Sequence, residues 1–173
     1  MNLYLRLLML KLRSKSNQRL SIWETAELPL RVAATDLDLF LHMNNGKYAS
    51  IMDLGRIDLL QRAGMWDTVR ANGWLPLVAA QTITYRRSLK PWQRFTLRTR
   101  YLGADEGWVY HEQTFLSGDE LYAHAIVRSR FVKNAGGSVS QEELEALSGP
   151  TPATASIPEW VREWAAASRP QTS

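Results

Sequence analysis

The stretch Asp36-Leu-Asp-Leu-Phe-Leu-His-Met-Asn-Asn-Gly-Lys-Tyr48 decides the fold of this chain. It is the densest polar cluster in the sequence, and it lies between an apolar segment and a run with helical periodicity. Asn44 can cap a helix that starts here, because its side-chain oxygen accepts from the first free backbone N–H groups. We therefore expect a strand before the stretch and a long helix after it.

The helix is predicted over residues 45–63. Apolar or small residues recur there at spacings of three and four, which is the pattern of one buried helix face: Tyr48, Met52, Gly55 and Leu59. Gly64 is a suitable end, since glycine adopts positive φ at no steric cost. A glycine inside a helix costs about 1 kcal/mol relative to alanine. Gly55 is therefore expected where a sheet approaches the helix closely.

The rest of the chain favours an antiparallel sheet. An apolar strand is predicted over residues 28–34, and after Gly73 the pattern changes to the alternation of half-buried strands. The further strands are expected at 77–87, 95–101, 108–116 and 121–132, joined mostly by hairpins. One long helix on one antiparallel sheet is an α+β arrangement. Because the other face of such a sheet needs cover, self-association is expected.

Three regions follow from this pattern. Residues 1–27 form an N-terminal extension, residues 28–135 form the domain, and residues 136–173 form a tail with a short helix near Glu159–Ala167. The extension begins with an apolar run that is too short to span a bilayer, which takes about 20 residues. Residues 1–13 can either dock on the domain or a partner chain, or lie weakly on a membrane surface as a basic amphipathic helix.

The polar stretch suits reactions in which negative charge develops. Free N–H groups and the positive end of the helix dipole meet at a helix N-terminus. Amides at Asn45 or Gly46 could stabilise an oxyanion, and a nearby carboxylate could act as nucleophile or as general base. The alternative is ordinary turn chemistry, because Asp and Asn before a helix are common caps.

The stretch resembles a signature of the hotdog thioesterases of the 4-hydroxybenzoyl-CoA thioesterase type. That signature has Asp-x-Asp followed by Gly-His-Val-Asn-Asn-x-x-Tyr, and here it stands as Asp36-Leu-Asp38, His42-Met-Asn44-Asn45 and Tyr48. The likeness is greatest to the thioesterase-superfamily-member branch, and Arg86-Arg87-Ser88-Leu89 also resembles that branch. The resemblance covers residues 28–135. It implies a hotdog fold, in which an antiparallel sheet wraps around one long central helix.

The resemblance also implies roles for individual residues. The catalytic carboxylate maps onto Asp38, with Asp36 as a neighbour that tunes or caps, and the amide that polarises the thioester carbonyl maps onto Asn45 or Gly46. Supporting positions are His42, Asn44 and Tyr48. The sequence departs from the signature at Leu41, where many members have glycine. A side chain there restricts the backbone, so the geometry of the loop is expected to differ.

Ligand contacts outside the stretch are less well defined by the sequence. Several strand arginines could hold the phosphates of coenzyme A, and Arg87 with Ser88 is the preferred pair. Alternatively, most of these arginines only solvate the outer face of the sheet. No metal or redox cofactor is implied, and His111 and His124 are expected to be structural. The chain has no Gly-x-Ser-x-Gly, which argues against a serine-hydrolase thioesterase.

Composition limits the remaining classes. The 173 residues suit one domain, the net charge is +4, and the chain has no cysteine, which fits a reducing, cytoplasmic location or one peripheral to a membrane. The arginines are scattered rather than interleaved with aromatic residues on one groove, so nucleic acid is not an expected partner.

The resulting hypothesis is hydrolysis of an acyl-CoA or acyl-carrier-protein thioester to a free acid and a thiol. The resemblance implies a homodimer or homotetramer in which a second subunit completes each site. Two alternatives stay open: a non-catalytic hotdog protein that binds acyl-CoA or lipid, and a hotdog enoyl-CoA hydratase. The usual Asp-x-Asn-Pro-x-His spacing of the hydratases is absent from the sequence.

Overall fold

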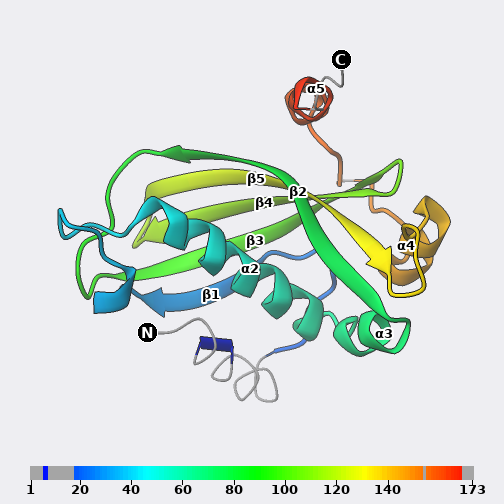
Figure 1. The fold of residues 1–173 in the computed structure, drawn as a ribbon, viewed down its shortest axis with the longest axis horizontal. Coiled ribbons are helices and arrows are strands. Elements are labelled where there is room, and N and C mark those ends of the chain that lie inside the picture. The colour runs from blue at the N-terminus through cyan, green and yellow to red at the C-terminus, as the bar shows by residue number, and fades with distance from the viewer. Residues whose placement is uncertain (1–5, 8–17, 154, 169–173) are drawn as a thin grey trace.

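A five-stranded antiparallel sheet forms the body of the protein in the computed structural model, which describes residues 6–7, 18–153 and 155–168 (Figure 1). The spatial order of the strands is β1-β3-β4-β5-β2. Their bounds are β1 Ala26–Arg31, β2 Trp74–Tyr85, β3 Arg94–Asp105, β4 Trp108–Ser117 and β5 Glu120–Lys133. The helices are the 3-10 helix η1 Ala34–Asp36, then α2 Asn45–Arg62, α3 Trp66–Ala71, α4 Gln141–Ser148 and α5 Glu159–Ala167. The predicted α+β class and the number of strands are confirmed.

Helix α2 crosses one face of the sheet as its single long helix (Figure 1). Its predicted ends are confirmed: the Asn44 side chain accepts from the Gly46 N–H, and Gly64 follows the helix with φ of +73°. Tyr48, Ile51 and Met52 on α2 are buried in one apolar cluster with strand residues such as Leu97 and Phe115. The helix is therefore held by its apolar face rather than by intrinsic propensity.

Gly55 lies where the sheet comes closest to α2. A Cβ added there would lie 2.4 Å from Thr99 Oγ1, 2.6 Å from Leu97 Cδ2 and 2.8 Å from Gln113 Nε2. Non-bonded heavy atoms attract each other best at about 3.5–4.0 Å, so no side chain fits at Gly55 unless these three strand side chains move. The close approach expected from the sequence is confirmed.

We predict that Gly55→Ala destabilises the protein by about 1–3 kcal/mol, which is the usual cost of overpacking a core. Helix propensity alone acts in the opposite direction, because alanine is favoured over glycine by about 1 kcal/mol. Urea unfolding of the two proteins measures the difference. An unchanged or higher midpoint for Gly55→Ala would contradict the close packing.

Strand pairing differs from a simple chain of hairpins. Hairpins join β3 to β4 and β4 to β5, but β2 pairs with β5, at the far side of the sheet from β3. The observed bounds of two strands also differ from the predicted ones. The first strand ends at Arg31 instead of residue 34, and β3 ends at Asp105 instead of residue 101, so the turn that follows it consists of Glu106 and Gly107. Strand β3 therefore runs further toward the hairpin than its alternation indicated, whereas β4 begins at Trp108 as predicted.

The face of the sheet away from α2 is covered by the tail. Ile126 on β5 packs with Val161 and Ala165 of α5, whereas its neighbour Val127 belongs to the cluster around α2. Successive strand residues point to opposite faces, so α5 and α2 lie on opposite sides of the sheet. The predicted helix at Glu159–Ala167 is confirmed with those bounds.

A buried polar group lies between α2 and the sheet. The Arg56 Nη1 donates to Gln113 Oε1 at 2.7 Å, and Gln113 Nε2 donates to Thr99 Oγ1 at 2.9 Å. His111 lies on the same face of β4 and is buried, and its Nδ1 has no hydrogen-bond partner. Burial, and after it the charge of Arg56, lower the pKa of His111 to about 3. The folded core therefore disfavours the protonated form of His111.

We predict that His111 makes stability fall with acidity below about pH 6.5. Its pKa is about 6.5 when unfolded and about 3 when folded, so the unfolded state binds the additional proton between these values. The contribution of His111 to the free energy of unfolding is fully present above its pKa in the unfolded chain. It is lost as the pH falls below that pKa, with a slope of at most about 1.4 kcal/mol per pH unit. Urea unfolding at pH 7 and 5.5 should show a smaller loss in His111→Gln. Equal losses in both proteins would exclude His111 as the source.

The N-terminal extension is described only at Arg6 and Leu7 and from residue 18 on. Arg6 is buried, and Leu7 packs against the cluster around α2. At these two residues the extension docks on the domain, as the first of the two alternatives predicts. The remainder of residues 1–13, and with it the membrane-surface alternative, lies outside the described residues. No helix in the described part of the chain is long and apolar enough to cross a membrane.

Candidate active site

The Asp36–Tyr48 stretch folds into a compact loop between η1 and α2. The Asn44 N–H donates to the Asp36 carbonyl at 2.8 Å, and Leu37 and Met43 form an isolated antiparallel bridge. A second bond ties the loop to the segment after β2, because the Met43 N–H donates to the Leu89 carbonyl at 2.9 Å. The loop therefore presents its polar residues at one end of the sheet, beside the N-terminus of α2.

Asp38 is half-buried and combines one anchored oxygen with one open oxygen. Its Oδ1 accepts from the Phe40 N–H at 2.9 Å and from the His42 N–H at 3.1 Å. The Oδ2 accepts no hydrogen bond from any described residue. Two backbone donors fix the carboxylate and leave Oδ2 able to contact a water molecule or a carbonyl carbon.

Asp36, in contrast to Asp38, is buried and has partners that stabilise the fold. It is 2% exposed, its Oδ2 accepts from the Ala33 N–H at 2.8 Å, and the same oxygen is ion-paired with the buried Arg6. The carboxylate thus caps η1 and neutralises a buried guanidinium. These contacts leave it no access to a substrate, which distinguishes the two members of the Asp-x-Asp pair.

The N-terminus of α2 has one amide that is open to a ligand. The Gly46 N–H donates to the Asn44 side chain at 2.8 Å, and the Lys47 N–H donates to the Asn44 carbonyl at 2.9 Å. The Asn45 N–H has no acceptor among the described residues. Of the two amides that the sequence indicated, Asn45 is therefore the one that could receive an oxyanion without breaking a cap.

The tip of the loop is apolar and exposed. Leu39 is 97% exposed, Phe40 81% and Leu41 65%, and the neighbouring His42 is exposed with no side-chain hydrogen bond to the described residues. Leu41 has φ of +59°, the left-handed conformation that favours glycine. Leu41 therefore has the backbone conformation that favours glycine, at the position where the family signature has glycine. The leucine side chain has not moved φ out of the left-handed region.

We predict that Leu41→Gly stabilises the protein by up to about 1 kcal/mol. A left-handed non-glycine residue costs roughly 1–2 kcal/mol, part of which is offset by the larger entropy of glycine in the unfolded chain. Little buried apolar area is lost, because the side chain is mostly exposed. The melting temperature of Leu41→Gly is compared with that of the wild type, and a small rise is expected. A fall would show that the leucine side chain contributes packing energy.

Tyr48 anchors the helix rather than facing the loop surface. It is 1% exposed, and its ring centroid lies 4.8 Å from that of Phe115 and 5.0 Å from that of Tyr85. Burial raises the pKa of its hydroxyl. These contacts fix the first turn of α2 against the sheet, which supports the open amide of Asn45.

Arg87 and Ser88 lie near the loop through the next residue, Leu89, whose carbonyl accepts from Met43. The Arg87 side chain is exposed and pairs with Glu120 at 2.9 Å. A phosphate could reach it only in competition with that carboxylate. The structure thus brings the predicted substrate-binding pair to the same end of the sheet, with Arg87 already engaged.

Sequence reasoning missed three residues that build this end of the sheet. Arg6 pairs with Asp36, Leu89 binds the loop backbone, and the Tyr85 hydroxyl donates to the Asn45 carbonyl at 3.4 Å. The only local signal was the apolar Leu89 after the arginine pair. The other two contacts join segments 30 and 40 residues apart and leave no pattern in the sequence.

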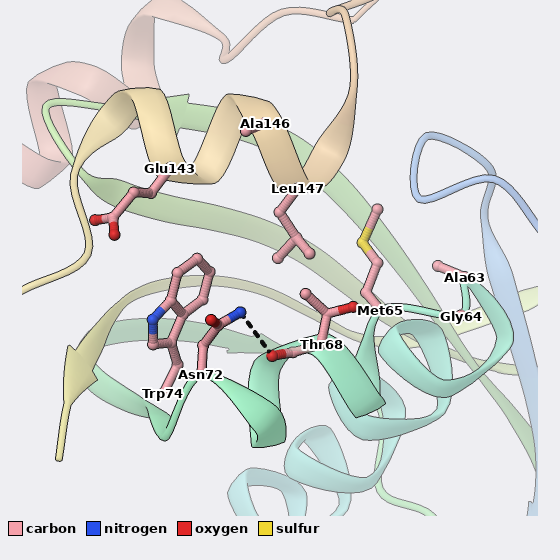
Figure 2. A pocket seen from close by; sticks show the side chains of 9 residues that line it. All are labelled: Ala63, Gly64, Met65, Thr68, Asn72, Trp74, Glu143, Ala146 and Leu147. Atoms are coloured by element: carbon pink, nitrogen blue, oxygen red, sulfur yellow. Dashed lines mark hydrogen bonds between the residues drawn. The ribbon is translucent and has the colours of Figure 1, made fainter.

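A pocket of about 480 Å³ lies at the opposite end of α2, between α3, α4 and the start of β2 (Figure 2). Trp74, Met65 and Leu147 give it an apolar wall. Its carboxylate, Glu143, is paired with Lys133 at 2.8 Å and caps α4. No free acid or base therefore faces this pocket from the described residues. The described part of the chain also has no group of three or more metal-ligating side chains.

Comparison with known proteins identifies the family of this chain. The sequence profile of the thioesterase-like superfamily matches residues 32–165. Protein THEM6 of Xenopus laevis is 37% identical over 95 residues, which cover 55% of this chain and 46% of that protein. The chain spans about half the length of the curated relatives it matches.

Solved structures agree on the architecture. A probable thioesterase from Bartonella henselae superposes with a TM-score of 0.63 at 20% identity, covering 68% of this chain and 98% of that one. A 1,4-dihydroxy-2-naphthoyl-CoA thioesterase from Synechocystis gives a TM-score of 0.62 at 10% identity, covering 75% of this chain and 100% of the other. With the profile matching most of its length, this chain has the hotdog fold and belongs to the thioesterase-like superfamily.

Proposed function

We propose that the protein hydrolyses the thioester of an acyl-CoA, or of an acyl-carrier protein, with Asp38 as the catalytic carboxylate. The observation that carries the proposal is the open Oδ2 of a backbone-anchored Asp38 at the loop that leads into α2, whose Asn45 N–H is also open. Family membership makes a thioester the preferred substrate class. The chemistry needs no further group than these two and a water molecule.

Asp38 can act in two ways. As a general base, it takes a proton from water while the water oxygen adds to the thioester carbonyl. As a nucleophile, it forms an acyl anhydride with loss of thiolate, and water then cleaves the anhydride to regenerate the carboxylate. In both routes the carbonyl oxygen becomes negative and the Asn45 N–H stabilises it. The thiolate leaves and is protonated, so the products are a free acid and a thiol.

The direct test is release of free thiol from a panel of short, long and aromatic acyl-CoAs. A thioesterase releases thiol with at least one member of the panel. Binding of acyl-CoA without thiol release would identify a non-catalytic binding protein. Hydration of an enoyl-CoA without thiol release would identify a hydratase, and either of these outcomes would overturn the proposal.

We further propose that the protein self-associates through β2. This strand lies at an edge of the sheet and is 12 residues long, and Leu75, Leu77 and Val78 are about half exposed on it. A long apolar edge is a template for pairing with another chain. The opposite edge, β1, is only six residues long and carries the charged Glu27 and Arg31, which disfavour such pairing.

Light scattering after size-exclusion chromatography tests the β2 edge. The wild type is expected to elute as a dimer or larger species, and Leu77→Glu is expected to shift it toward the monomer. Leu39→Glu, at a more exposed apolar position away from β2, is the control. A monomeric wild type, or equal effects of the two substitutions, would exclude pairing through β2.

A further inference from the structure

The tip of the loop before α2 consists of three consecutive apolar residues that the fold does not use. Leu39 is 97% exposed, Phe40 81% and Leu41 65%, and none of them belongs to an apolar cluster of the described residues. Leu41 also has φ of +59°, which disfavours most residues that carry a side chain. Packing therefore gives no reason for apolar side chains at this loop tip, whereas exposed apolar patches commonly mark interaction surfaces.

The backbone of the loop tip is closed on itself. The Asp38 N–H donates to the His42 carbonyl at 2.8 Å, and the Leu41 N–H donates to the Asp38 carbonyl at 3.2 Å. The N–H groups of Phe40 and His42 both donate to Asp38 Oδ1. An amide that lacks a partner is costly in an apolar medium. Because these four N–H groups already have acceptors within the loop, the tip can enter an apolar layer without losing hydrogen bonds to water.

A second exposed apolar side chain lies at the same end of the sheet. Trp92, in the connection from β2 to β3, is 56% exposed, and the guanidinium carbon of Arg31 lies 5.8 Å from its ring centroid. Figure 1 shows this connection and the loop before α2 together at one end of the sheet, where the Met43 N–H joins them by donating to the Leu89 carbonyl. Tryptophan is the residue type that favours the boundary between lipid and water.

Unpaired positive charge surrounds the loop tip. Four cations at this end of the sheet have exposed residues and no ion pair with the described part of the chain: Arg31, Arg86, Lys90 and Arg94. Arg87 is also here, but Glu120 neutralises it. Among the described residues at this end, the carboxylates without an ion pair are those of Asp38 and Asp119. The surface around the apolar tip is therefore positive and complements an anionic partner.

We propose that the loop tip, Leu39-Phe40-Leu41, inserts into an anionic lipid surface. A protein partner would need a cavity shaped to this protrusion, whereas a lipid layer accepts any apolar protrusion to a depth of about 5–10 Å. In this arrangement the ring of Trp92 lies at the level of the headgroups, and the four unpaired cations contact lipid phosphates. The contact is separate from residues 1–13, and it does not depend on hydrolysis.

Insertion can be measured at a single position, because the chain has no cysteine. Leu39→Cys in the full chain is labelled with a fluorophore that responds to polarity, and vesicles are then added. We expect brighter, blue-shifted emission with vesicles of phosphatidylcholine and phosphatidylserine, and a much smaller change with phosphatidylcholine alone. The control is the same label on Glu142→Cys, an exposed position on α4 at the opposite end of the sheet, where no change is expected.

Vesicle co-sedimentation of unlabelled proteins measures the affinity. Phe40→Ser is expected to bind about tenfold more weakly, because an apolar side chain no longer leaves water. Arg86→Gln and Lys90→Gln are each expected to weaken binding to the phosphatidylserine vesicles about fivefold, and added salt should reduce the binding of the wild type. Trp160→Ser removes an exposed aromatic ring from α5 and is the matched control. Residues 1–13 are the same in all these proteins, so any binding through them is common to the whole series.

Each outcome decides the proposal. A label at position 39 that does not respond to the vesicles, or equal binding by Phe40→Ser and the wild type, overturns it. An equal response of the label at position 142, or no preference for phosphatidylserine, also overturns it. A blue shift at position 39 that grows with protein concentration without vesicles would show that a second copy of the chain covers the tip instead. Neither assay contains a thioester, so failure here leaves the hydrolase proposal intact.

Discussion

Asp38→Asn is expected to lower the rate of thiol release by about 10²–10⁴-fold while leaving the melting temperature close to that of the wild type. The loss follows from removing the carboxylate, because a positioned general base contributes about that factor. The fold is retained since the Asn side-chain oxygen can still accept from the Phe40 and His42 N–H groups that Oδ1 now receives. The Oδ2, which loses its charge, has no partner in the described structure.

The control for this variant is Asp119→Asn, which removes an acid from the turn between β4 and β5. It is expected to keep the wild-type rate. A binding constant for a non-hydrolysable acyl-CoA analogue should also stay close to wild type in Asp38→Asn. If Asp38→Asn lost both affinity for the analogue and the rate of thiol release, Asp38 would hold the substrate rather than react with it.

Asp36→Asn is expected to destabilise the protein by about 3 kcal/mol. Removing one partner of a buried ion pair typically costs about 3–5 kcal/mol, because the other charge is left uncompensated. Here Arg6 would remain buried, with Nε and Nη1 already lacking partners. The retained amide oxygen can still cap the Ala33 N–H, which places the expected loss near the lower end of that range.

A double-mutant cycle with Arg6→Met provides the control. If the ion pair causes the loss, Asp36→Asn should cost much less in the Arg6→Met background than in the wild type. Equal costs in the two backgrounds would show that Asp36 acts through its cap of η1 alone. Urea unfolding midpoints measure all four proteins.

Local signals were sufficient to predict α2 and its surroundings. The helix was predicted over residues 45–63 and is found at Asn45–Arg62, because its cap, its apolar stripe and its terminal glycine all lie within the segment. Gly55 could be interpreted for the same reason, since a glycine inside a strong helix has few explanations besides close approach. Asp38, and Asn45 or Gly46, were also predicted as site residues from a local motif that spans 13 residues.

Non-local features could not be predicted in this way. The pairing of β2 with β5, which puts β2 at the edge, joins residues that are 38 to 59 positions apart, and alternation does not specify a partner. The ion pair between Arg6 and Asp36 crosses 30 residues and decides which aspartate is buried. The contact of Arg128 with the ring of Trp108 depends on adjacent strands, so the strand arginines looked alike in the sequence although their environments differ.

Helices α3 and α4 were missed for another reason. With six and eight residues, they are too short to show a helical period, and their ends are set by packing. In α4 the capping box of Ser140 and Glu143 was a readable signal, and it is present in the structure.

We propose that the two aspartates of Asp36-Leu-Asp38 have different roles, structural for Asp36 and catalytic for Asp38. The most direct measurement is the rate of thiol release per folded molecule, with the free energy of unfolding, for Asp36→Asn and Asp38→Asn side by side on the best acyl-CoA substrate. We expect opposite results for the two variants. Asp36→Asn loses stability but keeps the rate of thiol release, whereas Asp38→Asn loses that rate but keeps its stability. Undiminished thiol release by Asp38→Asn, or loss of rate in folded Asp36→Asn alone, would contradict it.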